Sequence, residues 1–416
     1  MNAGLRAGYK QTEVGVIPED WDADRLGHHA TFRTGPFGSA LHKSDYTNDG
    51  VPIVNPMHIV DGKLEPTRTM TITEQAAKNL SEFRITPGEI VIGRRGDMGR
   101  CAVVQAHQSG WLCGTGSMII RPSATDPNFL QRVLSSRRAI SAIEGASVGT
   151  TMVNLNQSTL AGLTIQLPPL PEQRAIAAAL SDVDALLTGL DRLIAKKRDL
   201  KQAAMQQLLT GVTRLPGFKG EWVARLLPEL AEIRSGGTPS TNDLAAWDGD
   251  IAWCTPTDIT ALAGDKYLTN TARRITPHGL KQSSAEVIPT GSVVMTSRAT
   301  IGECAINTIP MTTNQGFKNF IPFEAVDAEF LYYLLTTQKA SFISLCGGST
   351  FLEIGKTQLR GYGIRVPSEK AEQTAIATIL SDMDAELAAL EARRDKTRAL
   401  KQAMMQELLT GRVRLV

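Results

Sequence analysis

The sequence predicts an α+β protein with two similar globular domains of mixed helix and strand, separated by two long antiparallel coiled-coil helices in a pseudo-twofold circular organisation. Three observations predict this fold. Residues 171–215 align with residues 371–415 without a gap, and roughly 26 of about 45 positions are identical. The apolar residues inside each copy repeat at steps of three and four, and the blocks that precede the two copies are themselves weakly related.

Each repeated segment is predicted to form one long helix. Gly211 and Gly411 are suited to the left-handed cap that ends such a helix. About 38 residues correspond to roughly 57 Å of α-helix. The apolar seam of the first helix consists of Ile176, Leu180, Val183, Leu187, Leu190 and Ile194, and that of the second of Ile376, Leu380, Met383, Leu387 and Leu390. The later turns are rich in lysine and arginine, which suits either a solvated face or a surface for DNA phosphates or partner helices.

Proline-containing junctions, LPPLPEQ at 167–173 and VPSEKAEQ at 366–373, precede both helices. We therefore expect a first domain at residues 1–166, a junction and helix at 167–213, a second domain at 214–365, and a second junction and helix at 366–416. Short junctions favour an antiparallel helix pair, because a parallel pair needs a long return connection. The C-terminal segment GRVRLV has no continuation, and the N-terminal segment GVIPEDW resembles the sequence that would continue it. We therefore expect the two ends of the chain to be neighbours in space.

The two globular blocks share a local pattern. GEIVIGRRGDMGRCAVV from Gly88 and GSVVMTSRATIGECAIN from Gly291 both predict a strand, a tight glycine turn and a second strand. DPNFL from Asp126 and DAEFL from Asp327 each open a predicted helix. These matches indicate two diverged copies of one domain.

Composition restricts the function classes. There is no run of about 18 apolar residues and no signal peptide, so we expect a cytoplasmic protein without a membrane partner. The five scattered cysteines form no C-x-x-C pair and predict neither disulfides nor a zinc site. A formal net charge of +2 means that a nucleic-acid surface must be a local patch.

Three near-motifs predict no catalysis. VNPMH at 54–58 lacks the aromatic residue of the adenine-methyltransferase motif, and TFLEIGKT at 350–357 lacks the first glycine of a phosphate-binding loop. The six histidines show no metal-ligand spacing. We expect a non-enzymatic protein with neither a metal nor a cofactor of its own.

The junctions, the helices that end in LLTG, the opening YKQTEVGVIPEDW and its counterpart PGFKGEW resemble the specificity subunits of Type I restriction-modification systems over essentially the whole chain. The resemblance implies two target recognition domains that each read half of a bipartite double-stranded DNA target. It also implies two methyltransferase subunits that use S-adenosylmethionine for adenine-N6 methylation. For cleavage, it implies two motor-nuclease subunits that use ATP and Mg²⁺, in a system of phage defence.

Candidate DNA-binding residues follow from local argument. Positions shared by the blocks, such as Arg95 and Arg298, suit the scaffold or phosphate contacts, whereas positions that differ, such as Arg94 against Ser297, suit base reading. The candidates in the first block are Arg33, Asn55, His58, Arg94, Arg95, Asp97, Asn154 and Asn156, and those in the second are Arg234, Thr257, Ser297, Arg298, Asn314, Gln315, Lys318 and Lys356. The predicted partner-binding positions are Leu180, Leu187, Leu190, Leu380, Leu387 and Leu390.

Because the blocks have diverged more than the helices, we expect two unlike half-sites and an asymmetric target. Two alternatives remain open at this point. One is a specificity subunit of a methyltransferase-only system or of another type of restriction system. The other is a coiled-coil adaptor whose two heads bind proteins.

Overall fold

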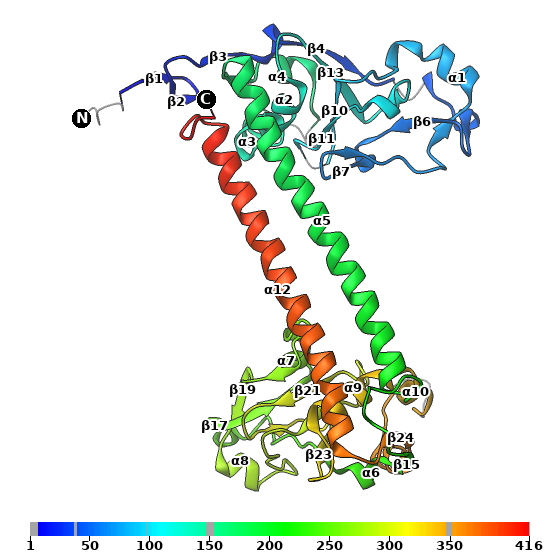
Figure 1. The fold of residues 1–416 in the computed structure, drawn as a ribbon. Helices are drawn as coiled ribbons and strands as arrows, with labels where there is room; N and C mark the ends of the chain where they lie inside the picture. Colours follow the sequence, from blue (N-terminus) through cyan, green and yellow to red (C-terminus); the bar gives the residue numbers. More distant parts are fainter. Residues whose placement is uncertain (1–6, 37–39, 97, 147–153, 347–351, 416) are drawn as a thin grey trace. The chain divides into compact units, whose positions relative to one another are not determined.

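The computed structural model describes residues 7–36, 40–96, 98–146, 154–346 and 352–415. The chain forms two compact units: unit 1 combines residues 1–190 with residues 393–416, and unit 2 comprises residues 191–392. Helix α5 (Leu170–Leu208) begins in unit 1 and ends in unit 2, whereas α12 (Lys370–Leu408) begins in unit 2 and ends in unit 1. Both ends of the chain therefore belong to the same unit, which confirms the predicted circular organisation (Figure 1).

Unit 1 contains one domain built on two sheets, with strand orders β11-β10-β13-β4 and β12-β6-β9-β5. Its strands are β1 (Tyr9–Thr12), β2 (Gly15–Pro18), β3 (Asp22–Arg25), β4 (Ala30–Thr34), β5 (Tyr46–Thr47), β6 (Val51–Val54), β7 (Ile59–Val60), β8 (Lys63–Leu64), β9 (Thr71–Ile72), β10 (Ile90–Gly93), β11 (Cys101–Val103), β12 (Leu112–Cys113), β13 (Ser117–Pro122) and β14 (Thr164–Leu167). Its short helices are η1 (Leu26–His28), η3 (Lys43–Asp45), η4 (Pro56–His58), α1 (Glu74–Asn79), η5 (Ser81–Phe83), η6 (Ala106–Gln108), α2 (Pro127–Leu134), α3 (Arg137–Gly145) and α4 (Gln157–Ala161).

Unit 2 repeats this plan. The sheet β16-β23-β20-β21-β18 corresponds to the first sheet of unit 1, with β18 as an additional edge strand, and β19-β17-β22 corresponds to the second. Its strands are β15 (Trp222–Leu226), β16 (Ala231–Ser235), β17 (Trp247–Cys254), β18 (Tyr267–Leu268), β19 (Arg273–Ile275), β20 (Val293–Thr296), β21 (Cys304–Asn307), β22 (Thr312–Thr313), β23 (Phe317–Pro322) and β24 (Gly363–Pro367). Its short helices are α6 (Leu227–Leu230), η7 (Leu244–Ala246), α7 (Pro256–Ala261), α8 (Pro277–Lys281), α9 (Ala328–Thr337), α10 (Lys339–Ser344) and α11 (Lys356–Arg360).

The predicted strand–turn–strand units are present in both domains. β10 pairs antiparallel with β11, and β20 pairs antiparallel with β21. Gly99 (φ +79°) and Gly302 (φ +84°) lie in the connecting turns, in the left-handed region that favours glycine. The predicted helices after Asp126 and Asp327 are α2 and α9, and each aspartate caps its helix by accepting a backbone N–H.

The apolar seams of the long helices are used mainly to hold each domain. In unit 1, Ile176 and Leu180 of α5 and Leu408 and Leu409 lie in one core with Phe129 and Leu134 of the domain. In unit 2, the equivalent residues Ile376, Leu380, Leu208 and Leu209 lie in one core with Phe330 and Leu335. Within each unit the two helix segments run antiparallel.

Ion pairs between the helix segments explain the basic late turns. In unit 1, Lys401 Nζ lies 2.6 Å from Asp184 Oδ1. In unit 2, Lys197 Nζ lies 2.6 Å from Glu386 Oε1, and Lys201 pairs with Asp384. Part of the positive charge on these turns is therefore neutralised by acidic residues of the neighbouring helix.

The shared Glu-Gln of each junction connects its helix to the domain. Gln173 accepts the Asp126 N–H at 2.9 Å and donates to the Pro168 carbonyl, and Gln373 bonds to Asp327 and Pro367 in the same way. Gln173 and Gln373 are buried. The junction sequence thus specifies how α5 and α12 leave their domains.

Candidate functional site

Each domain brings together one strand end, one capped turn and one turn that ends in glycine, Gly116 or Gly316, and we call this arrangement the recognition frame. In unit 1 the frame consists of Arg94–Arg95, the turn Asn55–His58 and residues 114–116. The Arg94 N–H donates to the Gly116 carbonyl at 2.9 Å, and the Gly114 N–H donates to the Val54 carbonyl at 2.8 Å. These bonds fix the backbone independently of the exposed side chains.

Unit 2 makes the same backbone bonds with different residues. The Ser297 N–H donates to the Gly316 carbonyl at 2.7 Å, and the Asn314 N–H donates to the Cys254 carbonyl at 2.9 Å. The turn Thr255–Asp258 replaces Asn55–His58, and in each turn the N–H of the first residue lies within hydrogen-bond distance of the fourth side chain, 2.7 Å from Asp258 Oδ2 and 3.2 Å from His58 Nδ1. The two frames share a backbone but not a set of side chains.

Arg94 is half-buried, and its Nε donates to the Leu155 carbonyl at 2.9 Å. Burial lowers the pKa of its guanidinium, and the neighbouring charge of Arg95 adds to the effect. Arg95 is exposed, and no described residue forms a hydrogen bond or an ion pair with its side chain. Asp97 lies outside the described residues. Asn154 and Asn156 are exposed beside Leu155, and Asn156 caps α4 by accepting the Thr159 N–H at 2.8 Å.

His58 is 2% exposed, so it belongs to the interior of the turn. Burial lowers the pKa of its imidazole, although the hydrogen bond to the Ile53 carbonyl opposes that shift. Its Nε2 has no partner among the described residues.

Asn55 is half-buried next to Gly114, where an added Cβ would lie 2.2 Å from Asn55 Oδ1. Arg33 of β4 pairs with Glu82 and stacks 5.3 Å above the Phe83 ring.

The position of Arg94 is taken in unit 2 by Ser297, which is fully buried. Lys318 of β23 supplies a cation there, with its Nζ 3.3 Å from Ser297 Oγ and 3.7 Å from Glu353 Oε1. Burial lowers the pKa of Lys318, while Glu353 opposes that shift. Arg298 is exposed and its Nε pairs with Glu353 Oε2 at 2.9 Å. Both frames therefore share one arginine after equivalent strands, Arg95 and Arg298, while the second cation comes from a different strand in each frame.

The other predicted residues of unit 2 surround this frame. Thr257 and Gln315 are exposed, and Gln315 accepts a hydrogen bond from Thr238 of the segment RSGGTPST. Asn314 accepts the Gly316 N–H at 2.9 Å, and Lys356 begins α11, half-buried. Arg234 of β16 pairs with Glu232 at 2.8 Å. DNA contact by all these residues stays a prediction.

Sequence reasoning missed Arg273 of β19. Its guanidinium carbon lies 3.8 Å above the Trp247 ring and 5.4 Å from that of Trp253, yet the residue is exposed. Trp253 Nε1 donates to the Gly237 carbonyl, beside the frame. Stacking on an aromatic ring pre-organises a guanidinium, which suits contact with a phosphate or a base. The closely spaced tryptophans in WDGDIAW, followed by Arg273 and Arg274, were the available signal.

The six leucines predicted to bind partners occupy different environments. Leu180 and Leu380 are 0% exposed within their own units, so these side chains are covered by the chain itself. Leu190 is also buried, while Leu187, Leu387 and Leu390 are half-buried. The exposed leucines of α5 are instead Leu170, Leu186, Leu193 and Leu200.

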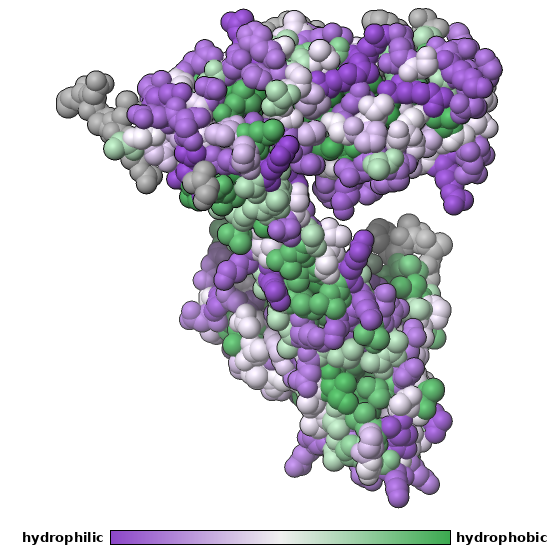
Figure 2. Space-filling view, turned by 45° about the horizontal axis from the view of Figure 1, so that its top comes forward, coloured by the Kyte–Doolittle hydropathy of each residue, from purple (hydrophilic) through white to green (hydrophobic). Residues whose placement is uncertain are grey.

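The described helices include none that combines the length and apolarity needed to cross a bilayer. The described residues also include no cluster of three histidine, cysteine or acidic side chains placed to hold a metal ion. On the face shown in Figure 2, hydrophilic residues dominate the domain of unit 1 and apolar side chains form smaller groups among them.

Comparison with known families decides the assignment of this fold. The family model described as "Type I restriction modification DNA specificity domain" matches residues 18–197 and again residues 219–398. The chain belongs to the Type I restriction-modification specificity family. Each matched segment contains one domain together with most of the following long helix, so the family repeat coincides with the structural repeat.

Individual relatives agree with the family assignment. The MjaIX specificity subunit of Methanocaldococcus jannaschii is 41% identical over 166 residues, which cover 39% of this chain and 38% of that protein. The putative MjaX specificity subunit of the same organism is 25% identical over 98% of this chain and 97% of its own length. The crystal structure of the HsdS subunit from Thermoanaerobacter tengcongensis shares the fold, with a TM-score of 0.54, 21% identity and coverage of 95% and 98%.

Members of this specificity family are non-catalytic, and the enzymatic activities belong to separate subunits. The resemblance drawn from the junctions and the repeated helices is therefore confirmed. The fold class is confirmed as well, since each unit contains a mixed domain and an antiparallel pair of helix segments.

Proposed function

We propose that the recognition frame of each unit reads one half of an asymmetric, bipartite DNA target. The observation that supports this most strongly is the pair of frames with matching backbone bonds and different side chains. A common backbone suits contacts to phosphates, which are the same in every sequence, while the differing side chains suit base edges. Unlike frames predict unlike half-sites.

The charges of the frames favour nucleic acid over an ordinary protein surface. Arg95 is an exposed cation beside the half-buried Arg94, and Arg298 is an exposed cation beside the buried Lys318. Arginine can hold guanine through two hydrogen bonds in the major groove. Because the chain as a whole is nearly neutral, a nucleic-acid surface must be a local patch of positive charge, and these residues provide such a patch.

In this proposal α5 and α12 dock two methyltransferase subunits, because the two segments are near-copies and offer two equivalent surfaces. Leu200 of α5 and its counterpart Leu400 of α12 are both exposed and supply apolar area at matching positions. The methyltransferase subunits use S-adenosylmethionine, and two motor-nuclease subunits use ATP and Mg²⁺. None of these groups is assigned to the present chain.

The test is to sequence the methylome of cells that express this chain with the methyltransferase encoded beside it, and of cells from which only this chain is deleted. We expect a split N6-methyladenine motif that requires the chain and has two unlike halves. A palindromic motif would contradict the asymmetry of the frames. Methylation that does not depend on the chain would contradict the proposed function and favour a protein-binding adaptor.

A further inference from the structure

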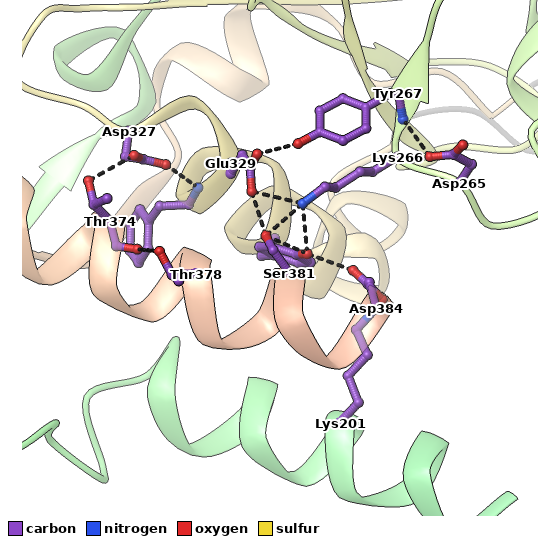
Figure 3. Close-up of polar contacts among 12 residues, drawn as sticks. Lys201, Asp265, Lys266, Tyr267, Asp327, Glu329, Thr374, Thr378, Ser381 and Asp384 are labelled. Atoms are coloured by element: carbon purple, nitrogen blue, oxygen red, sulfur yellow. Dashed lines mark hydrogen bonds and ion pairs between the residues drawn. The ribbon is translucent and has the colours of Figure 1, made fainter. Parts of the chain in front are cut away.

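A polar network in unit 2 connects β18, the edge strand of the sheet β16-β23-β20-β21-β18, to both helix segments (Figure 3); we call this sheet, and its counterpart β11-β10-β13-β4 in unit 1, the recognition sheet. Its central residue is Lys266, directly before β18, which is only 8% exposed. The Lys266 Nζ donates to Glu329 Oε2 at 2.8 Å, to Ser381 Oγ at 2.6 Å and to Tyr333 Oη at 3.2 Å. An ammonium group has three donors, so these bonds satisfy it completely.

The network extends from α9 to the helix segments. Tyr333 Oη donates to Asp384 Oδ2 at 2.6 Å, and Asp384 also pairs with Lys201 of α5. Tyr267 donates to Glu329 from the β18 side. Although burial raises the pKa of Glu329, the hydrogen bonds from Lys266, Ser381 and Tyr267 leave that pKa below its usual value.

The backbone of Lys266 belongs to the sheet that carries the frame. Its carbonyl accepts the Ile306 N–H of β21 at 2.7 Å, and β21 pairs with β20, which leads directly into Ser297. One residue therefore has its backbone bonded to the recognition sheet and its charged end bonded to α9 and α12. Its removal would leave Glu329, Ser381 and Tyr333 without their common donor.

Unit 1 lacks this connection. Arg132 of α2 occupies the place of Tyr333 and reaches Asp184 Oδ2 at 2.6 Å, while Lys401 reaches the other oxygen of Asp184. In the part of unit 1 that the structure describes, β8 lies beside β11 but pairs only with β7, so the sheet β11-β10-β13-β4 ends at β11. Lys63 of β8 is exposed, and the contact to Asp184 that corresponds to the one made by Tyr333 comes from α2 without the sheet edge.

We propose that Lys266 is a positioning residue that fixes the second recognition domain on its helix segments and so sets how strictly the second half-site must be placed. This inference rests on the proposed reading of a bipartite target. When Lys266 is lost, the domain gains freedom on α12, and the complex accepts targets whose halves are separated by one base pair more or fewer. Positional strictness in the first unit depends on Arg132 instead.

The experiment uses the assembled methyltransferase complex and duplex oligonucleotides that carry the methylome-defined target, with its native spacer or with a spacer changed by one base pair. We expect Lys266→Met to lower the native-to-shifted ratio of methylation rates about tenfold. Ser381→Ala, which removes one acceptor of Lys266 and one donor to Glu329 but leaves the Lys266–Glu329 ion pair, should act in the same direction, and Lys266→Arg should retain most of the ratio. Lys281→Met, at an exposed lysine of the same unit, is the matched control.

Two results would overturn the inference. One is an unchanged ratio in both Lys266→Met and Ser381→Ala. The other is an equal loss on all oligonucleotides together with a lower melting temperature, which would show that the network only stabilises the unit. If the wild-type complex itself requires no bipartite target, the proposed function fails, and that outcome is distinct from failure of the variants alone.

Discussion

Unit 1 and unit 2 close the same junction in two ways. In unit 2 the chain runs without a break from α5 to β15, and Arg214 Nε pairs with the buried Glu372 Oε1 at 2.6 Å beside Trp222. In unit 1 the equivalent cluster joins the two ends of the chain, because Arg414 Nε pairs with Glu172 Oε1 at 2.7 Å and Trp21 Nε1 donates to Glu172 Oε2 at 2.9 Å. The same kind of side-chain cluster therefore joins sequence-distant segments in unit 1 and neighbouring segments in unit 2.

Unit 1 also has contacts that unit 2 does not need. Arg414 forms two further bonds to Asp20, at 2.9 and 2.7 Å, and Tyr9 Oη donates to the Gly411 carbonyl at 3.0 Å. These contacts replace a covalent link by bonds between residues about 400 positions apart. The two junctions share their side chains but differ in chain connection. The two recognition frames, by contrast, share their backbone bonds but differ in their side chains. Junctions are thus the constant part of the repeat, and frames are the variable part.

The largest expected effect tests the junctions. Arg414→Met should lower the free energy of unfolding by about 3–5 kcal/mol, because it leaves the buried Glu172 charge unpaired. Arg214→Met should cost less, because Arg214 bonds to one carboxylate, Glu372, whereas Arg414 bonds to both Glu172 and Asp20. Urea unfolding of both variants, followed by tryptophan fluorescence, measures the difference. Equal losses would mean that the Asp20 bonds add no stability.

The frames are tested by paired arginine variants. Arg94→Ala should reduce discrimination at the first half-site by about 1–3 kcal/mol, while leaving the second half-site and assembly unchanged. Arg95→Ala should weaken binding to all sequences alike, as loss of a phosphate contact does. Competition binding with singly substituted oligonucleotides distinguishes the two effects. Loss of methyltransferase binding in Arg94→Ala would show instead that its bond to Leu155 is structural.

The helix ends should respond alike in the two units. Gly211 (φ +71°) and Gly411 (φ +70°) are left-handed, and an added Cβ would lie 2.8 Å from the Trp222 ring or 2.5 Å from Pro18. Alanine at either position should cost about 1–2 kcal/mol for the backbone alone. Thermal unfolding of both variants measures this cost. If the losses of unfolding free energy in the two alanine variants differ by more than about 1–2 kcal/mol, the two helix caps are not equivalent.

The smallest effect concerns acid stability. The pKa of Glu172 is lowered from 4.5 because the hydrogen bonds from Arg414, Trp21 and the Leu415 N–H outweigh the burial that raises it. A carboxyl group with a lowered folded-state pKa stabilises the fold above its unfolded pKa, and this contribution disappears as the pH falls through the folded value. The free energy of unfolding should therefore decrease below about pH 4.5. Glu172→Gln should flatten this part of the pH profile, and an unchanged slope would exclude Glu172 as its source.

Much of the fold could be predicted from local pattern. The heptad seam and the terminal glycines predicted two helices of about 38 residues, and each has 39. Strand–turn–strand units and the helices after Asp126 and Asp327 were also identified, since capping residues and glycine turns act within a few positions. The internal repeat and the family resemblance then specified the organisation of the whole chain.

The candidate site was only partly predictable. Sequence spacing drew attention to Arg94, His58 and Lys318, but it did not show that Arg94 bonds to Leu155 or that the other two are buried. It also gave no signal for Lys266, whose partners Glu329 and Ser381 lie 63 and 115 positions away.

Periodicity and repetition are properties of neighbouring residues, so the sequence by itself determined the helices, the domain repeat and the family. The tertiary structure alone decided which side chains are exposed in each frame, how Arg414 closes unit 1 and how Lys266 joins a sheet edge to α12. These arrangements depend on contacts between residues far apart in the chain, and the energy of such contacts comes from burial and hydrogen bonding that exist only after folding.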